Sequence, residues 1–364
     1  MIRMISSFCL ILLMLSSCSV DPGEDSFRPE VLDDGWPVSS PEEQGLDPQR
    51  IADVYQAAGQ LSNIFSLLVV KNGFLIAEQY FNGWGIADAF PTASATKSYT
   101  SALVGIALRE NVIPGLDRPM MEFFPEFAGQ AADPRKDGIT IRHLLKMRAG
   151  YPFDSDPPYL DLLLGSANWI PFLLEWPLAF DPDADWRYSN LSAHALAIIL
   201  ARSMNGSLRD FANEQLFDRI DVELAYWPQD ANGYYNGSGN MAFTSRDMAR
   251  FGLLYLAGGV WGGQPILPAG WVEESWRDHS TTNYPTYGNY FINCRYGYLW
   301  WHANCGRWDV HYAAGHGGQI IAVVPALNLM VVSTADSTDF GSGAWRKEKA
   351  MFNLVGKFIG QIQE

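Results

Sequence analysis

The chain has 364 residues, of which 48% are hydrophobic and 13% aromatic, and it carries a formal net charge of −15 at pH 7. This composition excludes an intrinsically disordered chain, and the length is sufficient for one large domain or two interleaved ones with a sizeable core. The strong negative charge, together with the lack of a basic cluster, argues against a nucleic-acid-binding protein.

Residues 1–17 have the pattern of a secretory signal peptide. Arg3 supplies a short positive region, and the apolar run Ile11–Leu15 is too short to span a membrane in the mature protein. The segment ends in Leu15-Ser16-Ser17-Cys18, which resembles the bacterial lipobox, whose cysteine is lipidated and becomes the mature N-terminus. The resemblance implies a lipid anchor on Cys18 in the cell envelope, on the periplasmic face of the outer membrane; the alternative is a plain signal peptide with an unrelated cysteine.

Residues 18–41 are rich in Asp, Glu, Pro, Gly and Ser and are predicted to form a solvated tether. No later stretch is apolar and long enough to cross a bilayer, so we expect membrane contact only through the lipid. The folded domain is predicted to cover residues 42–364 and to begin with a helix after Asp47-Pro48. A hairpin should follow, because the β-rich runs 64–70 and 74–81 flank Asn72-Gly73.

A helix of small and apolar residues is predicted after Pro91, and it contains Ser94 and Lys97. A serine in the first turn lies at the positive end of the helix dipole, and a lysine three residues later lies on the same face. Burial lowers the proton affinity of a lysine, which can then accept the serine proton. The alternative is a capping serine near a lysine whose ammonium group reaches solvent.

The middle of the chain reads as mainly helical, and strand patterns return towards the C-terminus. Strands at both ends of the chain predict an α+β fold with one antiparallel sheet, formed by residues 42–110 and 245–364 and flanked by helices. Residues 111–244 are predicted to form an all-α insert. The expected helices cover residues 141–147, 190–204, 207–220 and 344–362, and the expected later strands cover 296–301, 310–313, 319–324 and 329–334.

Two further motifs could place polar groups in a cleft. Tyr188-Ser189-Asn190 precedes an apolar helix, and His316-Gly317-Gly318 precedes a strand. Each has a structural alternative when taken alone: a packed tyrosine with Asn190 as a helix cap, and a glycine turn with an exposed histidine.

Cys294 and Cys305 are the two cysteines that remain after the signal segment and Cys18. In an exported protein they could form a disulfide across a short loop, or they could be free thiols, and the sequence leaves both alternatives open. Their spacing is too long, and their neighbouring ligands too few, for a metal site.

Taken in this order, the three motifs resemble those of the serine β-lactamase and penicillin-binding-protein superfamily. The likeness is greatest to its class C-like branch of esterases, D-amino-acid peptidases and 6-aminohexanoate-dimer hydrolases, and it extends over about residues 40–334. It implies a β-lactamase/transpeptidase-like fold. The third motif departs from the Lys-Thr-Gly or Lys-Ser-Gly of penicillin-processing members, since His316 replaces a permanent cation. We therefore expect esters or small amides as substrates rather than β-lactams.

The resemblance also implies the role of each motif residue. Ser94 is expected to be the nucleophile, with Lys97 and Tyr188 as a shared general-base system. Asn190 should orient Lys97 and the substrate, and the backbone N–H groups of Ser94 and Gln319 should form the oxyanion hole. His316, with Gly317 and Gly318, is expected to donate to the substrate beside this hole.

The predicted function is therefore a serine hydrolase that forms an acyl-enzyme on a small ester or amide, with no metal ion or other cofactor. The alternatives are a D-amino-acid peptidase or β-lactamase-type hydrolase of the same fold, or a non-catalytic lipid-anchored binding or sensor domain. The oligomeric state stays open.

Two rival sites are disfavoured by the sequence. An α/β-hydrolase needs Gly-x-Ser-x-Gly at a strand-to-helix elbow, whereas Asn236-Gly237-Ser238-Gly239-Asn240 lacks the first glycine and no alternation of strands and helices surrounds it. A metallohydrolase needs clustered ligands, but the six histidines are scattered and there is no His-Glu-x-x-His.

Overall fold

The computed structural model describes residues 27–154, 156, 158, 162–163, 165–166, 168–284 and 286–363. The predicted signal peptide and Cys18 lie outside the described residues. Within them, no helix is long and apolar enough to cross a membrane.

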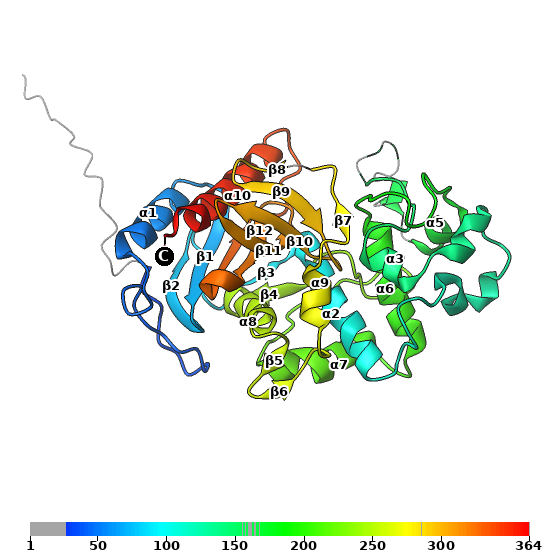
Figure 1. Cartoon of the computed structure of the whole chain (residues 1–364), viewed down its shortest axis with the longest axis horizontal. Helices are drawn as coiled ribbons and strands as arrows, with labels where there is room; N and C mark the ends of the chain where they lie inside the picture. The colour runs from blue at the N-terminus through cyan, green and yellow to red at the C-terminus, as the bar shows by residue number, and fades with distance from the viewer. Residues whose placement is uncertain are drawn as a thin grey trace, which may run out of the picture.

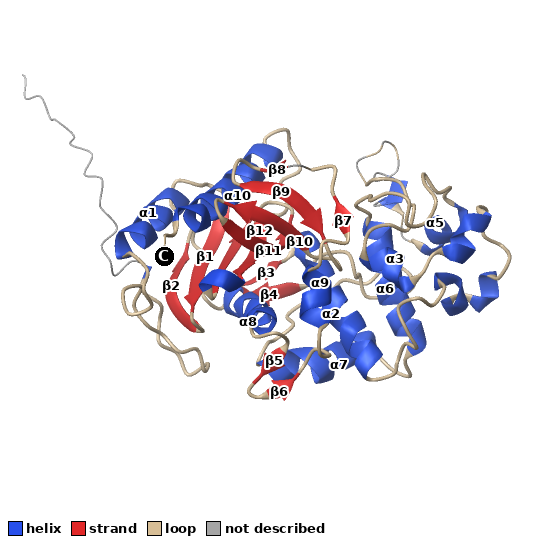
Figure 2. Ribbon diagram, viewed as in Figure 1, coloured by secondary structure: helices blue, strands red, loops and turns tan. Residues whose placement is uncertain are grey.

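A large sheet fills one end of the molecule, and the segment between β3 and β4 forms a helical region at the other end (Figure 1, Figure 2). The helices are α1 (Pro48–Ala58), α2 (Thr96–Arg109), α3 (Ile141–Leu145), α5 (Ile170–Glu175), α6 (Asn190–Ser203), α7 (Leu208–Ala212), α8 (Ser245–Leu256), α9 (Trp271–Trp276) and α10 (Ala344–Gln361). The strands are β1 (Ile64–Lys71), β2 (Phe74–Tyr80), β3 (Ala89–Pro91), β4 (Ala242–Thr244), β5 (Val260–Trp261), β6 (Gln264–Pro265), β7 (Ser280–Thr281), β8 (Thr286–Tyr287), β9 (Phe291–Tyr296), β10 (Trp301–Cys305), β11 (Trp308–Gly315), β12 (Gln319–Val324) and β13 (Leu329–Ala335).

The large sheet has the order β2-β1-β13-β12-β11-β10-β9-β7, with β8 paired to β9, and its neighbouring strands are antiparallel. The N-terminal hairpin thus joins the C-terminal strands through the pair β1–β13, as predicted. The hairpin itself is confirmed: Asn72 and Gly73 both have positive φ, at 55° and 82°, as a tight turn between twisted strands requires.

Helices cover both faces of the sheet, which is why β12 and β13 are buried along their whole length. Alternate side chains of a strand point to opposite faces. A Cβ atom at Gly252 of α8 would meet Met330 and Ile321, which lie on one face. Phe352 of α10 contacts the ring of Tyr312, which lies on the other. The core is therefore a three-layer arrangement of helix, sheet and helix.

One predicted strand is wrong. Residues 296–301 do not form one strand: Tyr296 ends β9, Trp301 begins β10, and residues 297–300 connect the two. Gly297 allows the chain to reverse there, because a Cβ atom at this position would lie 1.9 Å from the Ser275 carbonyl oxygen. Leu299 has a positive φ of 57° in the same turn. The aromatic residues of this stretch satisfy a β pattern, but their backbone turns.

Of the two alternatives left open for Cys294 and Cys305, the structure shows free thiols, both of them buried. They lie on the neighbouring strands β9 and β10, where Ile292 pairs with Asn304 across a register shift. Cys294 is therefore not opposite Cys305, and a disulfide needs its two Cβ atoms about 4 Å apart. The Cys294 thiol instead contacts the Tyr312 hydroxyl, at 3.6 Å.

The predicted tether is too long, because residues 27–36 pack against the domain. Phe27 and Trp36 are buried, and Phe27 stacks on Tyr55 of α1. Asp34 forms an ion pair with Arg246 of α8, at 2.7 Å. The acidic composition suggested solvation, but the two aromatic side chains and a buried partner charge hold this segment in place.

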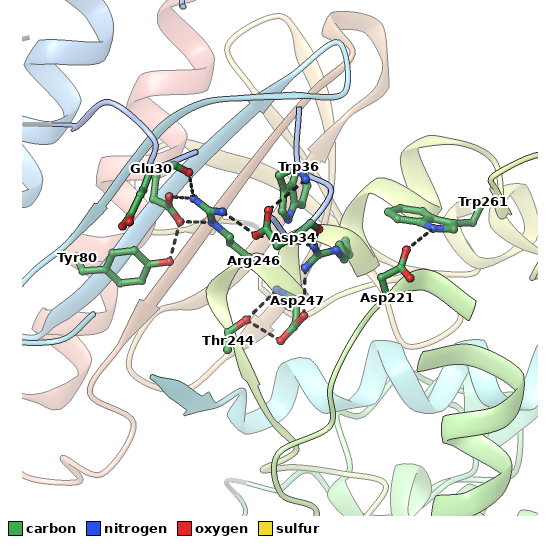
Figure 3. A network of polar contacts seen from close by, with 11 residues as sticks. Glu30, Asp34, Trp36, Tyr80, Asp221, Thr244, Arg246, Asp247 and Trp261 are labelled. Atoms are coloured by element: carbon green, nitrogen blue, oxygen red, sulfur yellow. Dashed lines mark hydrogen bonds and ion pairs between the residues drawn. The ribbon is translucent and has the colours of Figure 1, made fainter. Parts of the chain in front are cut away.

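Arg246 is the centre of a buried ionic network that joins three segments (Figure 3). Its guanidinium pairs with Glu78 of β2 at 2.5 Å as well as with Asp34, and it donates to the Glu30 carbonyl at 2.8 Å. Arg246 and Glu78 are 4% and 3% exposed in their side chains. Because water cannot replace a lost partner at this depth, the pair makes the packing of residues 27–36 depend on α8 and β2.

We predict that Glu78→Gln lowers the free energy of unfolding by about 3 kcal/mol, because it leaves the Arg246 charge buried with one carboxylate fewer. Urea denaturation followed by circular dichroism measures this loss. Glu122→Gln removes one partner of the exposed pair Arg118–Glu122 and serves as the control, with little expected effect. Equal effects of the two substitutions would contradict the prediction.

Candidate active site

The structure brings the first two predicted motifs together at the start of α2 and α6. Ser94 lies in a short 3-10 turn, Ala93–Ala95, which leads directly into α2, and Lys97 lies in the first turn of that helix. Tyr188 and Asn190 lie on either side of Ser189, which caps α6 by accepting the Ser192 N–H group. Ala93 has a positive φ of 45°, so the turn that presents the serine is held in an unfavourable backbone conformation.

The Lys97 side chain is the most tightly held polar group of the site. Its Nζ atom donates to Ser94 Oγ at 3.0 Å, to Asn190 Oδ1 at 2.6 Å and to the Ser238 carbonyl at 2.7 Å. The residue is only 1% exposed. Burial lowers the pKa of Lys97, and the charge of Asp154 opposes this effect. A lysine with a lowered pKa beside a serine hydroxyl can act as a base towards that hydroxyl.

Tyr188 completes the group around Ser94. Burial raises the pKa of the Tyr188 hydroxyl well above its usual value, although a hydrogen bond with Ser94 opposes the rise. Lys97 Nζ lies 4.8 Å from the centroid of the Tyr188 ring. Tyr188 is thus held in its neutral form and can pass a proton on, whereas Lys97 is the group whose environment favours the free base.

Ser94 opens into a cavity of about 180 Å³ with an aromatic wall. Tyr188 lines it beside the serine, and Glu348 of α10 contributes a carboxylate. The remaining lining residues are Tyr284, Tyr287, Trp301, Tyr312, Ala314, Gly315 and His316. A small acyl group fits such a space, and the flat rings restrict its shape.

The end of β11 approaches the serine turn at backbone distance. A Cβ atom at Gly315 would lie 2.2 Å from the Thr92 carbonyl oxygen, so only glycine allows this contact. Hydrogen-bonding groups of successive residues in a strand point to opposite edges. The Gly315 carbonyl faces β12, because it accepts the Gly318 N–H group at the turn. The Ala314 N–H group therefore faces the β10 side of the strand. Because β10 begins at Trp301, opposite Tyr312, it does not extend as far as Ala314.

This geometry points to a second oxyanion donor other than the predicted Gln319. Gln319 begins β12, where it pairs with Gly315 of β11, and it is not among the residues that line the cavity. The Ala314 N–H group, on the free edge of β11, is the partner that the structure offers to the N–H group of Ser94. The sequence alone does not show which residue beside the turn between β11 and β12 keeps an unpaired backbone N–H group.

The structure also gives His316 a different role from the predicted one. Its Nδ1 atom pairs with Glu348 at 2.8 Å, and its Nε2–H group donates to the Asp339 carbonyl at 2.7 Å. Both ring nitrogens are therefore engaged, and neither is free to donate to a substrate. The hydrogen bond to Glu348 raises the pKa of His316 above its usual value, although partial burial opposes this.

Glu348 fastens the whole turn to α10. Besides His316, its carboxylate accepts the Gly317 N–H group at 2.9 Å and the Tyr287 hydroxyl. Burial would raise the pKa of Glu348, but these hydrogen bonds lower it overall. Gly317 and Gly318 have φ values of 85° and 110° and do not line the cavity, so they shape the turn rather than bind substrate.

The sequence did not reveal the loop that accepts a hydrogen bond from Lys97 on the side away from Ser94. The stretch 236–240 resembles an incomplete hydrolase elbow, but it does not supply a nucleophile. It supplies the Ser238 carbonyl, which accepts a hydrogen bond from Lys97. Gly237 lets it pass α6, since a Cβ atom there would lie 2.6 Å from the Ala193 carbonyl oxygen. The Gly237 N–H group donates to His194, whose other ring nitrogen contacts Asp230 at 3.1 Å.

Asp154 was also missed. It lies in the proline-rich loop after α3, is 6% exposed, and accepts the Asn190 N–H group at 2.8 Å. No signal in the sequence distinguishes this carboxylate from the several others in the same loop. Among the described residues there is no cluster of histidine, cysteine, aspartate and glutamate side chains able to hold a metal ion.

Comparison with known proteins identifies relatives along most of the chain. The model of the Beta-lactamase family matches residues 51–349. A 6-aminohexanoate-dimer hydrolase of Paenarthrobacter ureafaciens is 24% identical over 305 residues, which cover 77% of this chain and 74% of the relative.

Solved structures share the fold at lower identity. A protein of Bacillus anthracis, provisionally described as a 6-aminohexanoate-dimer hydrolase, superposes with a TM-score of 0.70 at 20% identity, over 94% of this chain and 90% of the other. A D-stereospecific amidohydrolase of Streptomyces sp. gives a TM-score of 0.63 at 17% identity, over 83% and 97% of the two chains. The predicted fold class is confirmed, and with the family match so is the predicted class of enzyme, a serine hydrolase. The chain belongs to the Beta-lactamase family, and Ser94, Lys97 and Tyr188 occupy its candidate active site.

Proposed function

We propose that the protein hydrolyses small, uncharged esters or amides through an acyl-enzyme on Ser94. The observation that carries the proposal is the contact between the buried Lys97 Nζ atom and Ser94 Oγ, at 3.0 Å, at the edge of the aromatic cavity. The 6-aminohexanoate-dimer hydrolase among the relatives supports an amide as one type of bond that is cleaved.

In the acylation step, Ser94 Oγ attacks the substrate carbonyl carbon while its proton passes to the neutral Lys97 amine. The N–H groups of Ser94 and Ala314 stabilise the negative charge that develops on the carbonyl oxygen. The Tyr188 hydroxyl then passes a proton to the leaving group, which departs as an alcohol or amine, and the Lys97 ammonium group returns the proton taken from Ser94 to Tyr188. A water molecule attacks the acyl-enzyme by the reverse route and releases the acid and the free serine.

The charges around the cavity support uncharged substrates. Among the described lining residues, the one cationic side chain is His316, and Glu348 already neutralises it. Lys97 is enclosed by Ser94, Asn190 and Ser238. A substrate carboxylate, such as that of a β-lactam, would therefore enter without a partner cation, and its desolvation would be uncompensated.

We further propose that a lipid on Cys18 anchors this hydrolase in the cell envelope. The motif Leu15-Ser16-Ser17-Cys18 supports the proposal, as do the few residues between Cys18 and the packed segment that begins at Phe27. This arrangement would keep the catalytic domain close to the membrane surface, facing the periplasm.

Ser94→Ala should abolish hydrolysis of p-nitrophenyl acetate and labelling by a fluorophosphonate probe, and Lys97→Met should lower kcat/KM at least about 1,000-fold, because each removes a group needed in acylation. The exposed Ser342→Ala is the matched control. Ordinary ester hydrolysis by Ser94→Ala would refute the assignment of the nucleophile.

On a panel of short-chain esters, a D-amino-acid amide, 6-aminohexanoate dimer and nitrocefin, we expect turnover of esters or small amides well above that of nitrocefin.

His316→Gln should lower the free energy of unfolding by about 1 to 2 kcal/mol at pH 6, because it removes a charged hydrogen bond to Glu348. The folded state raises the pKa of His316, so its stabilisation is complete below the unfolded value of about 6.5 and is lost as pH rises through the folded value. Denaturation at pH 6 and pH 9 should show the difference shrinking. Lys347→Gln, at the neighbouring position on α10, should show no such dependence. A pH-independent loss of stability in His316→Gln would refute the stabilising ion pair between His316 and Glu348.

Cys18→Ser should move the protein from the membrane fraction to the soluble fraction of a detergent-free lysate, because the lipid attachment site is lost. Cys9→Ser changes the other cysteine of the leader and should leave the protein in membranes. Cys18→Ser protein that still sediments with membranes would count against the anchor.

A further inference from the structure

Asp154 is a buried carboxylate in the site that the proposed mechanism does not use. Its Oδ2 atom accepts the Asn190 N–H group at 2.8 Å, and its own N–H group donates to the Tyr188 carbonyl at 3.1 Å. Its Oδ1 atom is buried and has no hydrogen-bond partner among the described residues. The side chain is therefore attached to the backbone of the Tyr188–Asn190 motif, and half of its charge has no hydrogen-bond donor.

The opposite charge that acts on Asp154 is that of Lys97. The two residues are joined through Asn190, whose backbone N–H group donates to Asp154 and whose Oδ1 atom accepts from Lys97 Nζ at 2.6 Å. Burial raises the pKa of Asp154, and the charge of Lys97 opposes this. The reverse holds for Lys97, whose pKa is lowered by burial and raised by Asp154. In a site with little water, this mutual attraction is only weakly screened.

The tyrosines near Asp154 keep a constant charge around neutral pH. Tyr188, Tyr284 and Tyr296 face it, and burial raises the pKa of each, so they stay neutral. Glu348, which acts on Tyr188 and Tyr284 from α10, is paired with His316. Asp154 is thus the group whose negative charge can change the protonation of Lys97.

We propose that Asp154 is a positioning residue that sets the proton affinity of Lys97 and stabilises the ammonium ion that forms when Lys97 takes the proton of Ser94. The inference rests on the proposed acyl transfer, in which the neutral amine is the base. A nearby carboxylate then has two opposite effects: it keeps the free lysine protonated to higher pH, and it stabilises the transition state in which the amine gains charge.

A purely structural role is the alternative, since Asp154 satisfies the first N–H group of α6 through Asn190. Asp154→Asn separates the two roles, because the amide oxygen can still accept this N–H group while the negative charge is lost. Asp156, an exposed carboxylate in the same loop, provides the matched control Asp156→Asn.

The test is the pH dependence, from pH 5 to 9, of Ser94 labelling by a fluorophosphonate probe and of kcat/KM for p-nitrophenyl acetate. In Asp154→Asn the acidic limb of both profiles should move to lower pH by about one unit or more, because Lys97 loses its proton more readily. The plateau at high pH should fall about 10-fold to 100-fold. Asp156→Asn should match the wild type in both.

An acidic limb that stays in place in a folded Asp154→Asn protein would overturn the inference, whatever happens to the plateau. If circular dichroism shows that this variant does not fold, Asp154→Ser, which also keeps an oxygen acceptor, takes its place with the same expected shift. Failure of the probe to label wild-type Ser94 would refute the proposed function, whereas a labelled wild type with an unshifted limb in the variant would refute only the role of Asp154.

Discussion

The enclosure of the Lys97 side chain is the constraint on which the site depends. A lysine amine is a base near neutral pH only where water is excluded, and an excluded amine needs acceptors for its hydrogens. Ser94 lies in the 3-10 turn that leads into the helix of Lys97, but the Asn190 and Ser238 acceptors come from α6 and from the loop before β4. The sheet-bearing end and the helical end of the chain must therefore pack closely before the base exists at all.

Close backbone approaches make this enclosure possible. Gly315 brings β11 against the serine turn, and Gly237 brings the acceptor loop against α6, each at a distance that excludes a Cβ atom. Both contacts place carbonyl or N–H groups, rather than side chains, next to the reacting atoms. Backbone groups suit this purpose because they are fixed by the strands and helices around them and need no reorganisation during reaction.

The third motif has become a structural clamp instead of a source of positive charge. His316 and Glu348 neutralise one another, and Glu348 also holds the Gly317 N–H group and the Tyr287 hydroxyl. The clamp fixes the turn that follows β11, and it leaves the cavity walled by aromatic rings. Such a wall supports the proposal that the enzyme selects by shape and by the absence of charge, and so takes small esters or amides rather than anionic substrates.

Local rules in the sequence determined those features that depend on neighbours along the chain. The spacing of Ser94 and Lys97 brought their side chains into contact, Asn72-Gly73 specified the hairpin, and the order of the three motifs identified the family. Each of these follows from a few consecutive residues whose backbone preferences agree.

Tertiary structure decided everything that depends on which strand edge is open and which buried charges meet. It placed Ala314 rather than Gln319 at the cavity beside Ser94, engaged both nitrogens of His316, and set Cys294 out of register with Cys305. It also brought Asp154 to the Lys97 group from a loop that shows no pattern. Burial and pairing across segments far apart in the chain set these properties, and no local periodicity encodes them.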